Sequence, residues 1–168
     1  MDVVYLDNSV VSARGKSEAS ADLIAVEAIY KRHEQQQLQL VTSDMTHREI
    51  SQLRGSNRAP VEAVYALLEK VPFVEASNLV GISSWWGQYG GWNSPIFQEE
   101  PLLRRIKAIG LDQSDAQHVM IAAHNKCSVF LTFDVRTILR FTSELEKALP
   151  LRFRSPTAYE SENRVTGA

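Results

Sequence analysis

Four acidic residues stand at positions from which they could share one metal ion. Asp7 and Asp134 lie just past short apolar segments that favour β-strands. Glu49 and Asp115 lie in the first turns of two expected helices. Clustered carboxylates repel one another unless a cation lies between them, and oxygen-rich sites suit Mg²⁺ or Mn²⁺. Because such an ion can activate water and stabilise a leaving oxygen, the quartet predicts phosphodiester hydrolysis.

The segments around these acids predict strands that alternate with helices. Strands that are apolar on both sides indicate a parallel sheet covered by helices on both faces, so we expect an α/β fold, a three-layer α/β/α sandwich with a central parallel sheet. Ligands bind at the carboxyl edge of such a sheet, where Asp7 and Asp134 would face one crevice. The expected strands are 3–6, 38–41, 71–74, 129–132 and 149–153, and the expected helices are 17–37, 46–55, 60–70, 102–110, 114–126 and 136–148.

Each helical acid also has a structural interpretation. Glu49 lies three residues after Thr46, which is the spacing of a capping box. Asp115 follows Ser114, an expected helix cap, and could simply favour the helix dipole. Asp112 competes with Asp115 for the third acidic position. Asp7 and Asp134 could likewise only start loops, so it is the joint arrangement that favours a metal site.

Composition bounds the class of protein. A chain of 168 residues with 44% hydrophobic and 23% charged residues fits one folded domain. The net charge of −2 means that nucleic-acid binding would need a local basic patch. The single cysteine, Cys127, favours a reducing compartment, and the chain shows neither a membrane span nor a signal peptide, so we expect a cytoplasmic location.

Residues 77–101 form an irregular segment rich in tryptophan and glycine. Its aromatic rings could stack on RNA bases, cover a partner's groove or pack onto the domain's own core. Basic residues along the chain could flank the acidic centre and hold a phosphate backbone, although scattered arginines and lysines usually lie on a solvated face. We expect residues 155–168 to be a polar tail that hangs loose or docks weakly. The candidate RNA or partner contacts are Trp85, Trp86, Trp92 and Arg104.

Four sequence blocks together resemble a known family. The segments VYLDNSV, THREI, SDAQHVMIAA and FLTFD are similar, in order and spacing, to the motifs of PIN-domain ribonucleases, which include the VapC-type toxins. The resemblance covers about residues 2–153 and implies a PIN-like nuclease domain over 1–154. It further implies that the acidic quartet binds Mg²⁺ or Mn²⁺ and catalyses hydrolysis.

The resemblance also implies supporting residues and partners. Asn8 and Thr132 match positions that orient carboxylates or water, and His118, three residues after Asp115, could contact the site or the phosphate. The implied activity is that of an endoribonuclease acting on RNA. The implied biology is the toxin of a VapBC-type pair, with a cognate antitoxin and a possible homodimer.

Two other functions stay open at this point. The chain could be a non-catalytic PIN-like module that binds RNA or protein through its tryptophan segment. It could also be a phosphotransfer domain with Asp7 as nucleophile, although Ser9 occupies the place of the second acid in the D-x-D motif of aspartyl phosphatases. Metal titration separates the first from a nuclease, and a trapped acyl-phosphate would identify the second.

Overall fold

The computed structural model describes residues 1–13, 21–43, 45–46, 73–74 and 101–166. Within these ranges the chain forms a parallel sheet with β1 (Val3–Leu6) at its centre. The strand order is β3-β2-β1-β4-β5, and each neighbouring pair is parallel. The other strands are β2 (Gln39–Ser43), β3 (Phe73–Val74), β4 (Val129–Leu131) and β5 (Arg152–Arg154).

Alternate side chains of β1 enter two different cores. Val4 and Leu6 belong to a cluster with the apolar residues of α1 (Asn8–Ala13) and α2 (Ala21–Glu34). Tyr5 belongs to the opposite cluster, which includes Phe130 and the inner residues of α7 (Gln113–His124). Because strand side chains point alternately to opposite faces, both faces of β1 are buried.

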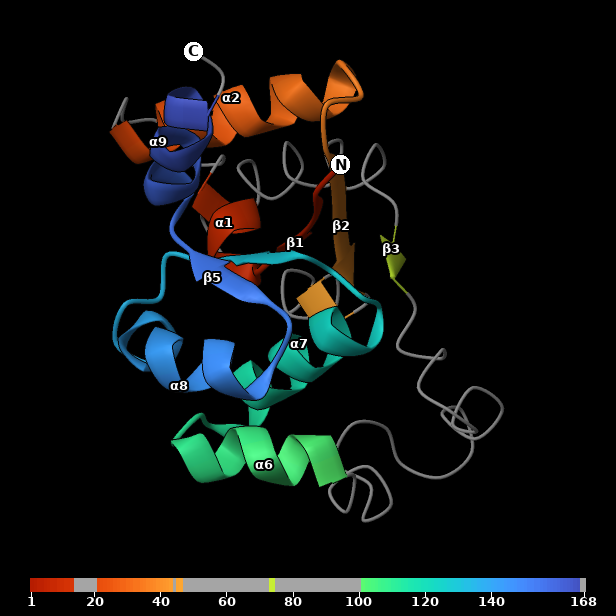
Figure 1. The fold of residues 1–168 in the computed structure, drawn as a ribbon, viewed down its shortest axis with the longest axis vertical. Coiled ribbons are helices and arrows are strands. Elements are labelled where there is room, and N and C mark those ends of the chain that lie inside the picture. The colour runs from red at the N-terminus through yellow and green to blue at the C-terminus, as the bar shows by residue number, and fades with distance from the viewer. Residues whose placement is uncertain (14–20, 44, 47–72, 75–100, 167–168) are drawn as a thin grey trace, which may run out of the picture.

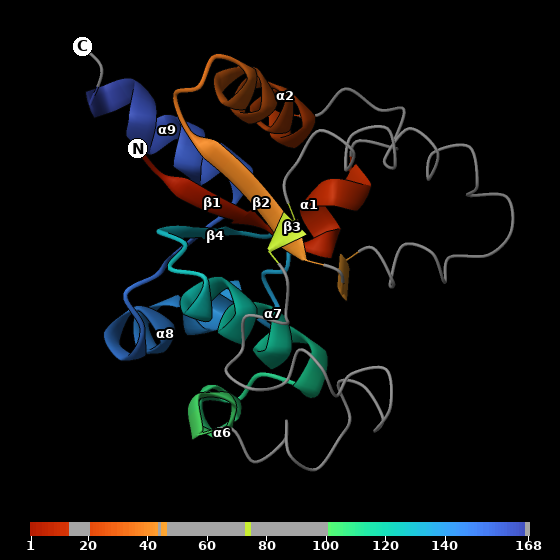
Figure 2. The ribbon, with the colours of Figure 1, turned by 90° about the vertical axis from the view of Figure 1, so that its right-hand side faces the viewer.

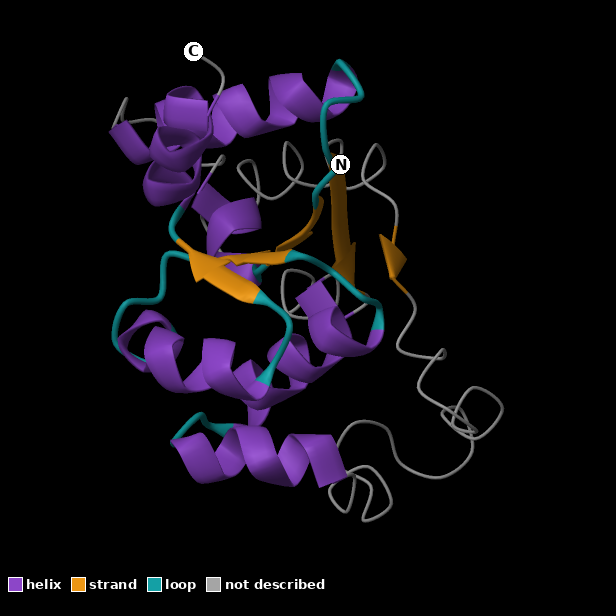
Figure 3. Cartoon of the chain, in the orientation of Figure 1, coloured by secondary structure: helices purple, strands orange, loops and turns teal. Residues whose placement is uncertain are grey.

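Helices therefore cover both faces of the sheet (Figure 2). α1, α2 and α9 (Pro156–Thr166) lie on one face, and α7 and α8 (Thr142–Ala148) lie on the other. α6 (Pro101–Ile109) packs on α7 and α8, on their side away from the sheet (Figure 3). The expected α/β class with a parallel sheet is confirmed, and the layers fit an α/β/α arrangement.

Several expected boundaries shift. The expected helix 136–148 is replaced by a turn, the 3₁₀ helix η3 (Leu139–Phe141) and then α8, because the backbone N–H of Leu139 bonds the carbonyl of Asp134 at 2.9 Å. β5 begins three residues later than the expected strand 149–153. The expected helices 46–55 and 60–70 and the tryptophan segment 77–101 lie wholly or almost wholly outside the described ranges.

The segment after Ser155 corrects the expectation of a loose polar tail. It forms α9, which packs along α2 (Figure 1). Tyr159 is fully buried and its hydroxyl donates to Oδ2 of Asp2 at 2.9 Å. Glu160 forms an ion pair with Arg32 of α2 at 3.0 Å. One buried tyrosine and one partly buried ion pair thus attach a helix whose sequence is mostly polar.

Gly110 ends α6 as expected, and its environment explains why glycine is needed there. Its φ of +122° lies in a region that other residues rarely adopt. A Cβ at this position would lie 2.7 Å from Cζ of Phe141. Along the described ranges, no helix combines the length and the apolar content that crossing a membrane requires.

Candidate functional site

The candidate site lies at the carboxyl ends of β1 and β4, where the strand order reverses. The chain runs outward from β1 through β2 to β3, and then returns to the other side of β1 as β4 and β5. This switch point is where open α/β sheets bind ligands. The backbone N–H of Asp7 donates to the carbonyl of Leu131 at 3.0 Å, so the pairing of β1 with β4 extends to the first acid.

The carboxylate of Asp7 is buried and held by two hydroxyl groups. Its Oδ2 accepts hydrogen bonds from Oγ of Ser9 and from Oγ1 of Thr132, each at 2.7 Å. Thr132, expected from the sequence to orient a carboxylate or water, thus contacts Asp7 directly. Hydrogen bonds to a charged acceptor are stronger than neutral ones, so this pair fixes one carboxylate oxygen.

The same two hydroxyls order the backbone that leads to Asp134. Oγ of Ser9 accepts from the N–H of Phe133 at 3.0 Å, and Oγ1 of Thr132 accepts from the N–H of Asp134 at 2.9 Å. Oδ1 of Asp134 accepts from the N–H of Thr137 at 2.8 Å. Asp134 therefore closes the turn before η3 and lies beside the first acid.

Asp115 lies in the first turn of α7, whose cap is Asp112 rather than the expected Ser114. Asp112 has an extended backbone and its Oδ1 accepts from the N–H of Asp115 at 2.9 Å. This assigns Asp112 the capping role and leaves the Asp115 side chain to the site. The two acids that compete in the sequence are thus separated by backbone geometry.

The surroundings of Asp115 disfavour the charged form of its carboxyl. Its pKa is raised to about 6, first by burial and then by the negative charges of Asp112, Asp7 and Asp134. The Thr137 hydroxyl lies nearby, outside hydrogen-bond geometry, and lowers this pKa. Oδ2 of Asp115 is buried with no hydrogen-bond partner in the described part of the chain. A buried carboxylate oxygen without a partner in the protein can accept a cation or a hydrogen-bond donor.

Three of the four predicted acids are thus brought to one edge of the sheet, and Glu49 lies outside the described ranges. Over those ranges, no group of three or more His, Cys, Asp or Glu side chains has the spacing of a finished metal site. The donor set is nevertheless all oxygen, and the negative charges of Asp112, Asp7 and Asp134 act on the Asp115 carboxyl, whose Oδ2 has no hydrogen-bond partner in the described ranges. Carboxylate oxygens are the type of ligand that a hard divalent cation takes.

A buried polar network lies beneath the acids. The Tyr5 hydroxyl is 2.7 Å from Oγ of Ser43 and 2.7 Å from Nδ1 of His118. Burial raises the pKa of Tyr5 well above its ordinary value, so the hydroxyl stays protonated. His118, expected to contact the site or the phosphate, is buried, and its Nδ1 forms a hydrogen bond with the Tyr5 hydroxyl.

Three of these contact residues are missing from the sequence prediction. Ser9 follows Asp7 by two residues, a spacing at which a hydroxyl can turn back to a carboxylate. Tyr5 stands in an otherwise apolar strand and Ser43 ends β2, and a buried polar group in either place needs a partner. A polar residue in a buried strand indicates that it forms a hydrogen bond, but the sequence does not show with which residue.

The remaining predicted residues lie elsewhere or outside the described ranges. Asn8 begins α1 and its Oδ1 accepts from Oγ of Ser12 at 3.0 Å, so Ser9 rather than Asn8 contacts Asp7. Arg104 is exposed on α6. The three tryptophans, at 85, 86 and 92, are outside the described ranges.

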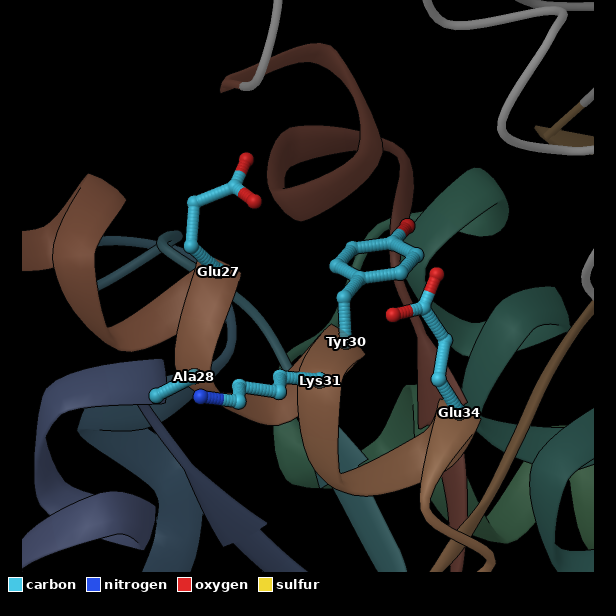
Figure 4. A pocket seen from close by; sticks show the side chains of 5 residues that line it. All are labelled: Glu27, Ala28, Tyr30, Lys31 and Glu34. Carbon is cyan, nitrogen blue, oxygen red and sulfur yellow. The ribbon is translucent and has the colours of Figure 1, made fainter.

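A separate open pocket of about 420 Å³ lies on α2 (Figure 4). The carboxylates of Glu27 and Glu34 flank the Tyr30 ring in this view, and Lys31 and Ala28 complete the described lining. α2 covers the face of the sheet opposite α7, so this pocket is distinct from the acidic edge.

Comparison of the chain with family models, curated proteins and solved structures finds no match.

Proposed function

We propose that this protein is a metal-dependent endoribonuclease of the PIN type that hydrolyses RNA phosphodiesters. The observation that carries the proposal is Asp115. Its carboxyl is half-buried, its pKa is raised to about 6 and its Oδ2 is unpartnered within the described ranges, beside Asp7 and Asp134 at the switch point of a parallel sheet. Strongly perturbed carboxylates in such a place are typical of functional sites.

The residues that would hold the ion are Asp7, Asp115 and Asp134, with Glu49 as the fourth acid of the sequence pattern. Mg²⁺ and Mn²⁺ both prefer oxygen ligands. When bound, such an ion lowers the pKa of water and neutralises charge on the phosphate. A bound cation would offset the negative charges of Asp112, Asp7 and Asp134, which together with burial raise the pKa of Asp115.

Hydrogen bonds from neighbouring residues hold the carboxylates of Asp7 and Asp134 in place. Ser9 and Thr132 hold one oxygen of Asp7, and the N–H of Thr137 holds one oxygen of Asp134. Side chains that are already held in place need little reorganisation during the reaction. Such preorganisation is the main source of electrostatic catalysis. In the proposed hydrolysis the oxygen of water bonds to phosphorus, one P–O ester bond breaks, and the departing oxygen takes a proton to leave as an alcohol.

The finer parts of the proposal rest on the sequence resemblance. These are the PIN-like identity of the fold, the role as toxin of a VapBC-type pair, the cognate antitoxin, the homodimer and the cytoplasmic location. An unregulated ribonuclease would harm its host, so a protein partner that covers the acidic edge is a consistent part of the proposal.

The test is cleavage of an end-labelled single-stranded RNA pool with Mn²⁺, Mg²⁺ or excess EDTA. Wild type should cleave with either ion and stop in EDTA, whereas Asp7→Asn and Asp115→Asn should lose at least about a hundredfold in rate. Glu144→Gln removes an exposed carboxylate of α8 and is the matched control, with wild-type activity expected.

Folding of each variant is checked by thermal unfolding. RNA binding without cleavage, in every ion, would overturn the nuclease and favour the non-catalytic module. Cleavage that survives EDTA would overturn the metal dependence. Cleavage that survives both Asn variants would show that the acids are not catalytic.

A further inference from the structure

A chain of buried hydrogen bonds joins three elements of the fold next to the acidic edge. The Tyr5 hydroxyl of β1 lies 2.7 Å from Oγ of Ser43 at the end of β2 and 2.7 Å from Nδ1 of His118 on α7. Tyr5 is completely buried and His118 is 2% exposed. The two contacts span 38 and 113 positions of the sequence, so they are purely tertiary.

The members of this network stand at fixed spacings from two acids. Tyr5 precedes Asp7 by two residues, a spacing that puts side chains on the same side of an extended chain. His118 follows Asp115 by three residues, on the same face of α7. The Tyr5–His118 bond therefore ties the strand that presents Asp7 to the helix that presents Asp115.

The three acids are held in different ways. Asp7 accepts bonds from Ser9 and Thr132, and Asp134 accepts one from Thr137. Oδ2 of Asp115 has no such partner in the described ranges. Its place relative to Asp7 therefore depends on how α7 is docked on the sheet.

Apolar packing alone would dock α7 less specifically. The Tyr5 ring stacks on Phe130 with centroids 5.2 Å apart, and apolar residues surround it in the same cluster. A phenylalanine would preserve that packing. Hydrogen bonds add direction and length, and a satisfied buried network fixes one arrangement of its elements.

We propose that Tyr5 and His118 are positioning residues, which set the separation of Asp115 from Asp7 by fixing α7 against β1. This inference rests on the proposed function, since the geometry that it fixes is that of the cation site. Groups that orient metal ligands typically change metal affinity about 10- to 100-fold when they are lost.

The test measures Mn²⁺ affinity by calorimetry, together with kcat and KM for RNA, in Tyr5→Phe. Affinity for Mn²⁺ should fall about tenfold and kcat should fall with KM little changed, because RNA contacts are left in place. Tyr159→Phe is the matched control. It also removes a bonded hydroxyl from a fully buried tyrosine, but in the opposite core. Tyr159→Phe should retain wild-type Mn²⁺ affinity and kcat even if its Tm falls as much as that of Tyr5→Phe.

A second pair of variants covers the case in which Tyr5→Phe does not fold. His118→Asn keeps a polar atom at the place of Nδ1 and should retain most of the Mn²⁺ affinity, whereas His118→Leu should lose it about tenfold. Equal affinity in His118→Asn and His118→Leu would overturn the proposal.

The outcomes also separate this inference from the proposed function. Wild-type protein that binds Mn²⁺ and cleaves RNA, with Tyr5→Phe and Tyr159→Phe indistinguishable from it, overturns the positioning role alone. Wild-type protein that neither binds Mn²⁺ nor cleaves RNA overturns the proposed function, and the positioning role with it.

Discussion

Oγ1 of Thr132 donates a 2.7 Å hydrogen bond to Oδ2 of Asp7, across 125 positions of the sequence. The bond joins the carboxyl ends of the two strands that flank the switch point. It is buried and its acceptor is a carboxylate, so its loss leaves part of a charge without a partner.

Thr132→Val should therefore destabilise the protein. The loss is about 2 kcal/mol, because the substitution preserves side-chain shape but removes the bond to the charged Asp7 and the acceptor of the Asp134 N–H. Urea unfolding at pH 7 measures it. Thr142→Val, which removes a bond to the neutral carbonyl of Leu139, should cost only about 1 kcal/mol. Equal losses would mean that the Asp7 contact carries no additional free energy.

The pKa of Asp115 predicts a dependence of stability on pH. This pKa is about 6 in the folded protein, against 3.8 for an ordinary aspartate, so the charged form is disfavoured by folding. In metal-free buffer, Asp115 should not affect the free energy of unfolding below pH 4. Between pH 4 and 6 it should lower that free energy progressively, and above pH 6 the lowering should stay constant.

Asp115→Asn should accordingly be more stable than wild type at pH 7. The gain should be about 1 kcal/mol, since solvent screens a half-buried carboxyl. The two proteins should unfold at equal urea concentrations at pH 4. A gain that persists unchanged at pH 4 would contradict the titration of Asp115 as its origin.

Addition of Mn²⁺ should reverse that order of stability. Binding to the folded state alone stabilises a protein by roughly 2.7 kcal/mol when the ion is present at a hundredfold excess over its Kd. Wild type should therefore rise in Tm with Mn²⁺, and Asp115→Asn should rise much less. Thermal unfolding in a Mn²⁺ series measures this, and identical rises would exclude Asp115 from the cation site.

Asp134 has a structural role that can be separated from a catalytic one. Its Oδ1 accepts from the N–H of Thr137, and an asparagine can make the same bond. Asp134→Asn should keep the wild-type Tm and lose at least about tenfold in RNA cleavage. Asp134→Ala should lose both activity and about 1 kcal/mol of stability. Full activity in Asp134→Asn would leave this residue as a cap alone.

Tyr159 should be essential to the attachment of α9. Tyr159→Ala removes a fully buried ring and the bond to Asp2, and should cost about 3–4 kcal/mol in urea unfolding. Ser161→Ala, an exposed change on the same helix, should stay within about 0.5 kcal/mol of wild type. A loss below about 1 kcal/mol for Tyr159→Ala would indicate that α9 contributes little to the fold.

Local patterns predict some elements of this fold, but they miss α1 and α9. The apolar runs before Asp7 and Asp134 identify β1 and β4, because a strand buried on both faces has few polar residues. Those runs also place both acids at one edge, as the parallel pairing of β1 with β4 requires. The amphipathic spacing from 102 onward identifies α6 and its glycine stop.

The sequence does not determine which of several possible contacts form when the elements pack together. Asp112 and Ser114 are both good caps, and the extended backbone at Asp112 decides between them. The polar sequence of α9 gives little sign of a helix, since its stability comes from Tyr159 in the core and from the contact of Glu160 with Arg32. The pairing of Tyr5 with His118 depends on how α7 docks, which no local pattern contains.

The strand order also has a consequence for folding during synthesis. β1 leaves the ribosome before the other strands, yet its partner on one side, β4, follows only after residue 128 of 168. Contacts between such distant parts of a chain form slowly, because a long loop must close first. A nascent chain that ends before β4 has Asp7 without Thr132 and no turn to carry Asp134. The acidic cluster is therefore among the last parts of the molecule to assemble, and a partly synthesised chain has no complete site.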